Sequence, residues 1–123
     1  MATTVTKTTI SAEAAKEVIA AAEAKASEIG VAMVITVLDD AGHLKGMLRM
    51  DGAPVPSIGV ANDKAYTAAG FGLSTDQWYD VVKDDPALLH GIGFIDRFIM
   101  IGGGYPLRQG DQLIGAIGTS GGS

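Results

Sequence analysis

The stretch "VAMVITVLDDAGHLKGMLRM", residues 31–50, decides the fold of this chain. Residues 31–38 are β-branched and apolar on both faces, which is typical of a central strand. Residues 39–42 form a turn, because aspartate side chains can cap the backbone and glycine allows a positive φ. Residues 43–50 then alternate apolar and polar side chains. Two strands joined this tightly predict an antiparallel hairpin.

Helical patterns lie on both sides of this hairpin. A helix is predicted over 12–29, where apolar residues recur on one face and Gly30 follows as a stop. Small apolar residues within 57–71 predict a second helix. A shorter helix begins with the Ser-x-x-Gln capping box at 74–77 and runs to Val82, before an Asp-Asp-Pro sequence that ends it.

The C-terminal third returns to strands. Residues 97–101, "RFIMI", predict a third strand, and a last hairpin turns at 110–111 with its final strand at 112–118. The order is therefore α-β-β-α-α-β-β-β, with no βαβ crossover. Such a run of hairpins predicts an α+β domain, an antiparallel sheet with helices packed on it. Residues 1–123 are expected to form this single domain, with 1–10 as an N-terminal extension.

Composition excludes several classes of function. The net charge is −5, and the nine Lys and Arg residues form no run, which argues against nucleic acid and anionic membrane partners. The absence of cysteine excludes disulfides, thiolate zinc sites and iron–sulfur clusters. The first residues do not resemble a secretory signal, and the longest apolar stretch is too short to span a membrane. A cytoplasmic protein is expected.

Glycine is unusually common, with 17 residues, and ten of them lie between Gly91 and Gly122. Three are consecutive at 102–104, directly after the predicted third strand. Such a run can direct backbone N–H groups at an anion. It can equally form a bulge or a turn against which another backbone packs closely. The run is not a P-loop, because no Gly-Lys-Ser/Thr sequence follows.

Charged residues near the hairpin are the first candidates for a site. In "RMDGAPVPS", residues 49–57, Arg49 and Asp51 either form an ion pair that pins the strand exit or line the rim of a pocket. Arginine presents a fork that matches a carboxylate, so the rim would suit an acidic ligand. Lys64, in "ANDKAYTAA", either extends past alanines into water or points into a cleft beside Arg49.

The chain has two histidines, His43 and His90. His43 follows a turn and is expected to be exposed. His90, in "ALLHGIG", lies among apolar residues and is the candidate ligand for a metal or for heme iron. A purely structural role is the alternative. No second histidine or acidic cluster accompanies either residue, so a metal site made by protein side chains alone is not predicted.

Five blocks, in this order and spacing, resemble the GlcG/HbpS family: "VLDDAGHL", "RMDGAPVPS", "ANDKAYTAAGF", "GGGYPL" and "GDQLIGAIGTSGG". These are small heme- and corrinoid-associated domains, and the C-terminal domain of PduO proteins is a relative. The resemblance covers about residues 10–122. It implies a profilin-like fold with a five-stranded antiparallel sheet, and assembly into dimers or larger homo-oligomers. Relatives usually continue past "SGG" into a closing helix that this sequence lacks.

The resemblance also implies a site. Arg49 matches the family's strand-exit motif, Lys64 its helix motif, and Gly102, Gly103 and Gly104 its glycine–proline turn. In this interpretation Arg49 and Lys64 face the carboxylates of heme or another tetrapyrrole, with the glycine backbone beneath. Heme is the implied cofactor and a corrinoid the less favoured one. Oxidative degradation of the bound heme is a further implication.

Two other functions stay open, and so does the question of whether the protein is an enzyme. One is a cofactor-independent enzyme acting on a small carboxylated metabolite of a catabolic pathway. Arg49 would anchor the carboxylate, and Asp51 or Lys64 would serve as the general acid or base, since a buried lysine near an arginine should have a lowered pKa. The other is an assembly or scaffold protein without a ligand.

Overall fold

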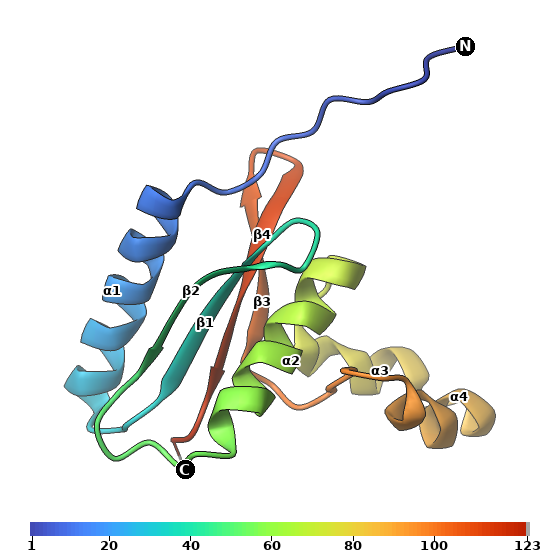
Figure 1. Cartoon of the computed structure of the whole chain (residues 1–123). Coiled ribbons are helices and arrows are strands. Elements are labelled where there is room, and N and C mark those ends of the chain that lie inside the picture. Colours follow the sequence, from blue (N-terminus) through green and yellow to red (C-terminus); the bar gives the residue numbers. More distant parts are fainter. Residues whose placement is uncertain (123) are drawn as a thin grey trace.

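The hairpin predicted within residues 31–50 forms the centre and one edge of a four-stranded antiparallel sheet (Figure 1). The structure is a computed structural model and describes residues 1–122. The helices and strands are α1 (Ala12–Ile29), β1 (Val34–Asp39), β2 (Leu44–Arg49), α2 (Ser57–Phe71), α3 (Trp78–Val82), α4 (Pro86–Gly91), β3 (Gly104–Gln109) and β4 (Gln112–Ser120), with short 3-10 turns at η1 (Thr75–Gln77) and η2 (Ile92–Phe94).

The strands follow the order β2-β1-β4-β3, and every neighbouring pair is antiparallel. Val34 has Arg49 as its cross-strand partner on one side and Ser120 on the other. Five of the six residues of β1 are buried, which confirms the prediction of a central strand. Asp39 closes the turn after β1, because its Oδ1 accepts hydrogen bonds from the backbone N–H groups of Ala41 and His43.

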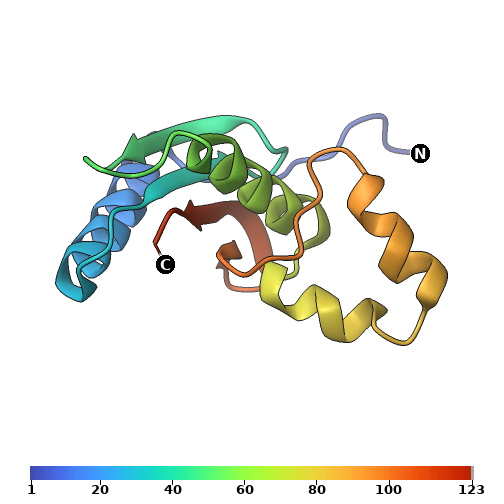
Figure 2. The same ribbon diagram turned by 90° about the horizontal axis from the view of Figure 1, so that it is seen from below.

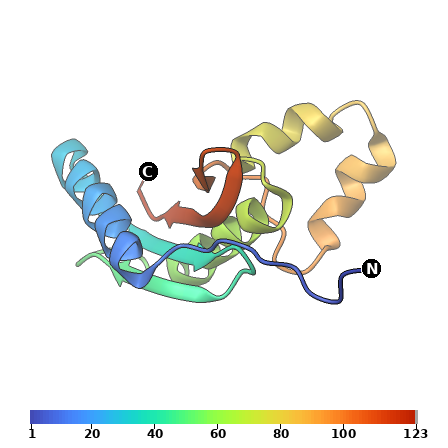
Figure 3. The same cartoon turned by 90° about the horizontal axis from the view of Figure 1, so that it is seen from above.

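The two long helices cover opposite faces of the sheet, as the views along its edge show (Figures 2 and 3). α1 packs against Val37, and α2 packs against Leu38, the next residue of β1. α2 approaches closely because alanines line its inner face and Gly118 lies beneath it. A Cβ atom at Gly118 would overlap the carbonyl oxygen of Ala61. The apolar core therefore lies on both sides of β1.

Both long helices confirm the sequence prediction. The hydroxyl of Ser11 accepts a hydrogen bond from the N–H of Ala14, 3.0 Å away, and Gly30 ends α1 at a φ of 78°. α2 begins at Ser57 and ends before Gly72, also at positive φ. No helix within residues 1–122 is long and apolar enough to cross a membrane.

The prediction of five strands is wrong, because residues 97–101 do not form one. Arg97 has a φ of 63°, which interrupts an extended chain. The N–H of Ile99 donates to the hydroxyl of Thr67 on α2, 3.1 Å away, instead of to a neighbouring strand. Phe98 packs into a small helical cluster. The apolar side chains of this segment therefore serve contacts with helices.

Residues 75–94 form a helical arm that extends away from the sheet beyond α2 (Figure 1). Its second helix, α4, was not predicted. Asp85 and Pro86 end one helix but also begin the next, because the Asp85 side chain accepts from the N–H of Leu88 and proline suits the first helical position. The arm is held by a cluster of Val82, Ile92 and Phe98, against which Trp78, Leu89 and Met100 pack.

Candidate functional site

Lys64 is buried where α2 crosses the end of β4. Its side chain is on the sheet side of α2, and only 6% of the residue is exposed. Nζ donates a hydrogen bond to the carbonyl oxygen of Thr119, 2.9 Å away. Within residues 1–122 no carboxylate forms an ion pair with it. Burial lowers the pKa of Lys64, because the charged form loses its hydration. A buried lysine without an anionic partner is a candidate functional group.

Glycines make room for this lysine. Gly103 has a φ of 127°, and a Cβ there would lie 2.6 Å from the Thr119 carbonyl oxygen and 3.0 Å from Lys64 Nζ. A Cβ at Gly104 would lie 2.5 Å from the backbone oxygen of Lys64. The N–H of Gly104 donates to the buried hydroxyl of Thr75 at 2.9 Å. The glycine run thus allows close packing of backbone against α2, while Gly102 is exposed beside Asp76.

The corner after β2 is closed by backbone contacts. Arg49 Nη1 donates to the carbonyl oxygen of Ala53 at 3.2 Å, and the N–H of Ala53 donates to the carbonyl of Met50 at 3.0 Å. Gly52 has a φ of 90°, as the third residue of such a turn can require. Asp51 is exposed, and within the described residues it forms no ion pair with Arg49. Arg49 therefore stabilises this corner through its hydrogen bond to the Ala53 carbonyl.

The structure brings only part of the predicted site together. Lys64, Gly103 and Gly104 are in contact. Arg49 lies at the same end of the sheet, in the cross-strand row of Val34 and Ser120, about two strand spacings or ~10 Å from the backbone of β4. His90 is exposed on α4, in the arm, on the opposite side of the molecule from β2 (Figure 1).

An apolar groove lies beside Thr119 on the α1 face of the sheet. It has a volume of about 200 Å³, and helix α1 and residues 31–35 form most of it. The neighbouring surface of β3 and β4 is apolar too. Tyr105 is the cross-strand partner of Ile117, which packs in part against the cluster that joins α1 to β1. Tyr105 is 45% exposed. Thr119 lines the groove, and its carbonyl oxygen is the one that accepts the hydrogen bond of Lys64.

A larger cavity, of about 310 Å³, was not predicted. Its walls come from the turn at 40–42, the outer face of α2 from Tyr66 to Phe71, and the connection at 95–98. No motif marks it, because these three segments are far apart in the sequence. Arg97, which lines it, was assigned to the strand that does not form.

Comparison with known proteins places the chain in a family. The model of the HbpS-like family, described as "Haem degrading protein HbpS-like", matches residues 10–123. The chain is 40% identical over 117 residues to an uncharacterized 15.0 kDa protein of the dhaT-dhaS intergenic region in Citrobacter freundii, covering 94% of this chain and 82% of that one. It is 30% identical to GlcG of Escherichia coli K12, with 94% and 84% covered. The protein belongs to the HbpS-like family, which confirms the resemblance.

Solved structures agree with this assignment. Klebsiella pneumoniae ORFY superposes with a TM-score of 0.92 and 36% identity, over 100% of this chain and 86% of that one. A double mutant of HbpS from Streptomyces reticuli gives 0.85 and 27%, over 96% and 78%. PduOC, solved as a complex with heme, gives 0.84 and 32%, over 94% and 84%. The α+β fold with an antiparallel sheet and packed helices is therefore that of the family.

Proposed function

We propose that this protein binds heme or a related tetrapyrrole, with one ligand carboxylate at Lys64. The observation that carries the proposal is the buried ammonium of Lys64, which has a carbonyl partner and no ion pair within residues 1–122. An uncompensated buried charge is costly, and a carboxylate within hydrogen-bonding distance would offset that cost. Family membership and the heme complex of PduOC support the choice of ligand.

The apolar groove on the α1 face is lined by Thr119, whose carbonyl accepts the hydrogen bond of Lys64, and this groove suits a flat macrocycle. Alternate residues of a strand share a face, so Ile117 and Thr119 lie on the same side of β4, with Tyr105 beside Ile117. Contact with these side chains and with the groove beside α1 would remove the apolar part of the ligand from water. Arg49, at the same end of the sheet, is the proposed partner for a second carboxylate.

The test is a hemin titration followed by the Soret absorption band. Lys64→Met should weaken binding by tenfold or more, since a charge-assisted hydrogen bond contributes roughly 1.5–3 kcal/mol. Lys45→Met is the matched control, because Lys45 is exposed on β2. Absence of a saturable Soret shift, or equal loss in both variants, would contradict the proposal.

Two further pairs test the remaining predicted ligands. Hemin binding by Arg49→Ala is compared with hemin binding by Arg108→Ala. The pair is matched because each arginine donates to a backbone carbonyl, and Arg108 donates to that of Gly72 at 2.9 Å. His90→Ala is compared with His43→Ala, because both imidazoles are exposed. A changed Soret maximum in His90→Ala alone would support His90 as the iron ligand, and unchanged spectra in both would reject it. Loss of the Soret band of the complex with reductant and O₂, faster than for free hemin, would establish degradation.

A second candidate function is supported by the lowered pKa of Lys64. A lysine that loses its proton more easily than usual can act as a general base, as an enzyme acting on a small carboxylated metabolite would require. Asp51 is exposed in its turn, which leaves Lys64 as the better-placed group. A thermal-shift screen with pyruvate and lactate tests this alternative. Stabilisation that disappears in Lys64→Met but persists in Lys45→Met would support it.

Assembly into homo-oligomers is also part of the proposal. Several large apolar side chains are exposed, including Phe94, at 90%, and Ile101, at 68%. Contacts between copies would bury such side chains. Light scattering coupled to size-exclusion chromatography measures the assembly, and a monomeric mass at micromolar concentration would contradict it.

A further inference from the structure

A second cavity lies on the outer side of α2, between the turn at 40–42 and the connection at 95–98. It shares no lining residue with the Lys64 site. Its volume of about 310 Å³ is at the lower end of the range for small-molecule pockets. Its position between three separate segments means that tertiary packing, not one loop, sets its shape.

Arg97 is a fixed wall of this cavity. Its Nε lies 3.1 Å from Asp63 Oδ1, and its Nη2 donates to the side-chain oxygen of Asn62. Its carbonyl accepts from the hydroxyl of Thr67 at 3.0 Å. These contacts hold a non-glycine residue at a φ of 63°, a conformation that proteins retain where the surroundings determine it. Because Asp63 neutralises the guanidinium, Arg97 offers no free positive charge to a ligand.

Aromatic rings form the apolar part of the cavity. The Cζ atom of Arg97 lies 3.7 Å from the centroid of the Tyr66 ring. Gly42 packs on the same ring, since a Cβ there would lie 3.1 Å from two of its carbon atoms. Phe71 and Phe98 meet edge to face, with centroids 5.7 Å apart, and Phe71 is 55% exposed. The rings are therefore held in place before any ligand arrives.

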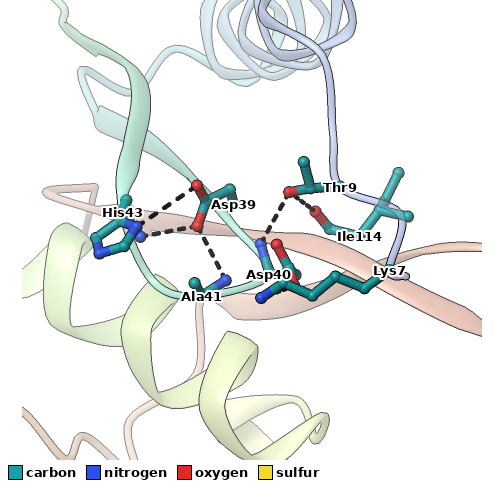
Figure 4. A network of polar contacts seen from close by, with 7 residues as sticks. All are labelled: Lys7, Thr9, Asp39, Asp40, Ala41, His43 and Ile114. Atoms are coloured by element: carbon teal, nitrogen blue, oxygen red, sulfur yellow. Dashed lines mark hydrogen bonds and ion pairs between the residues drawn. The ribbon is translucent and has the colours of Figure 1, made fainter. Parts of the chain in front are cut away.

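The free charge of the cavity is negative. Asp40 Oδ2 lies 2.9 Å from Lys7 Nζ, and the backbone N–H of Asp40 donates to the hydroxyl of Thr9 (Figure 4). Hydrogen bonds with Thr9 and Lys7 lower the pKa of Asp40, so its carboxylate stays ionised. Asp96, on the opposite wall, is exposed and forms no ion pair within residues 1–122. Of the charged residues that line the cavity, Asp96 is thus the one left without a counter-ion.

We propose that this cavity is a second ligand site, for a small planar aromatic cation such as an aromatic amine or a protonated nitrogen heterocycle. The ring of the ligand lies against Tyr66, Phe71 and Phe98. Its positively charged nitrogen donates to Asp96, with Asp40 nearby. The negative rim repels the carboxylates of heme, so the site is separate from the Lys64 site and does not depend on heme binding.

The test compares two probes with the same ring and opposite charge. Tryptamine and indole-3-acetate are titrated into ¹⁵N-labelled protein of residues 1–123, and backbone amide shifts are recorded. Tryptamine should shift amides of residues 40–42, 66–71 and 95–98, and should bind about two- to fivefold more tightly than indole-3-acetate, as expected for one partly exposed charge pair. Hemin should not displace it.

Three variants locate the determinants. Asp96→Asn should remove the preference for tryptamine, whereas Asp84→Asn, in the exposed turn of the arm, should keep it. Phe71→Ala should weaken both probes equally. The proposal is overturned if shifts fall outside the three segments, if the two probes bind equally well, or if hemin competes. It is also overturned if tryptamine causes no shift, whether sedimentation velocity shows a monomer or an assembly of several copies.

Discussion

Around Lys64 the backbone of α2 lies against the backbone of the sheet, whereas in the arm of residues 75–94 short helices pack through their side chains. At the first place Gly103, Gly104 and Gly118 lack the Cβ atoms that would collide with a neighbouring backbone carbonyl oxygen. At the second place a small cluster around Val82, Ile92 and Phe98 is the whole core, and Phe94 beside it is 90% exposed.

This difference indicates how each region responds to change. Where two backbones are in contact, no flexible side-chain atoms lie between them that could move aside. One added methyl group near Lys64 must therefore displace a helix. The arm can yield locally, because few contacts tie it to the sheet. One such tie is the hydroxyl of Thr75, which accepts from the N–H of Gly104. We expect the Lys64 region to unfold with the sheet and the arm to open before it.

The largest effect is expected for Gly118→Ala. The new Cβ would overlap the carbonyl oxygen of Ala61, and moving α2 outward should cost about 3 kcal/mol of unfolding free energy. Gly91→Ala, in the arm, is the control: nothing lies within 4 Å of its Cβ position, and the change should stay within about 1 kcal/mol. Urea denaturation measures both. Similar losses in the two variants would remove the distinction between the regions.

A smaller global effect is expected for Ile92→Ala in the arm. Ile92 is 4% exposed, and truncation of a buried isoleucine costs roughly 2–4 kcal/mol of local stability. Amide hydrogen exchange should accelerate in α3 and α4 while the amides of β1 keep their protection, because the arm opens by itself. If β1 exchanges faster by the same factor, the arm and the sheet are one cooperative unit.

The smallest effect is a pH dependence at Lys64. Burial lowers its pKa below the ordinary value of 10.5, so between the two pKa values the unfolded chain binds more protons than the folded chain. Raising the pH toward 10.5 therefore stabilises the wild type relative to Lys64→Met, and the cost of the buried charge is fully present below the lowered pKa. Urea unfolding of both proteins across this range measures the difference. A difference that stays constant with pH would contradict a lowered pKa.

Elements with a local signal could be predicted. The helix at 12–29, the hairpin turn at 39–42 and the turn at 110–111 follow from caps, periodicity and turn residues, and all are present. Residues 97–101 show the limit of this reasoning. Their short apolar run fits a strand, but the segment packs on α2 and the arm. Five residues do not encode whether the partner is a strand or a helix.

The candidate site, like the fold, could be predicted from the sequence only in part. Arg49, Lys64 and the glycine run could be selected from residue type and motif. Their positions relative to one another could not be predicted from the sequence. Arg49 donates to the carbonyl of Ala53, while Lys64 donates to the carbonyl of Thr119, 55 residues away in the chain. The cavity at Arg97 was missed because long-range packing alone brings its walls together.

The sequence by itself determined the family, the central strand and the helices on either side, because these depend on short-range periodicity, turn chemistry and ordered motifs. Only the tertiary structure decided that the sheet has four strands, that Lys64 is buried without a carboxylate partner within residues 1–122, and that Asp96 is left as the unpaired charge of an aromatic cavity. Burial and charge pairing depend on which distant segments pack together, and a local pattern does not contain that information.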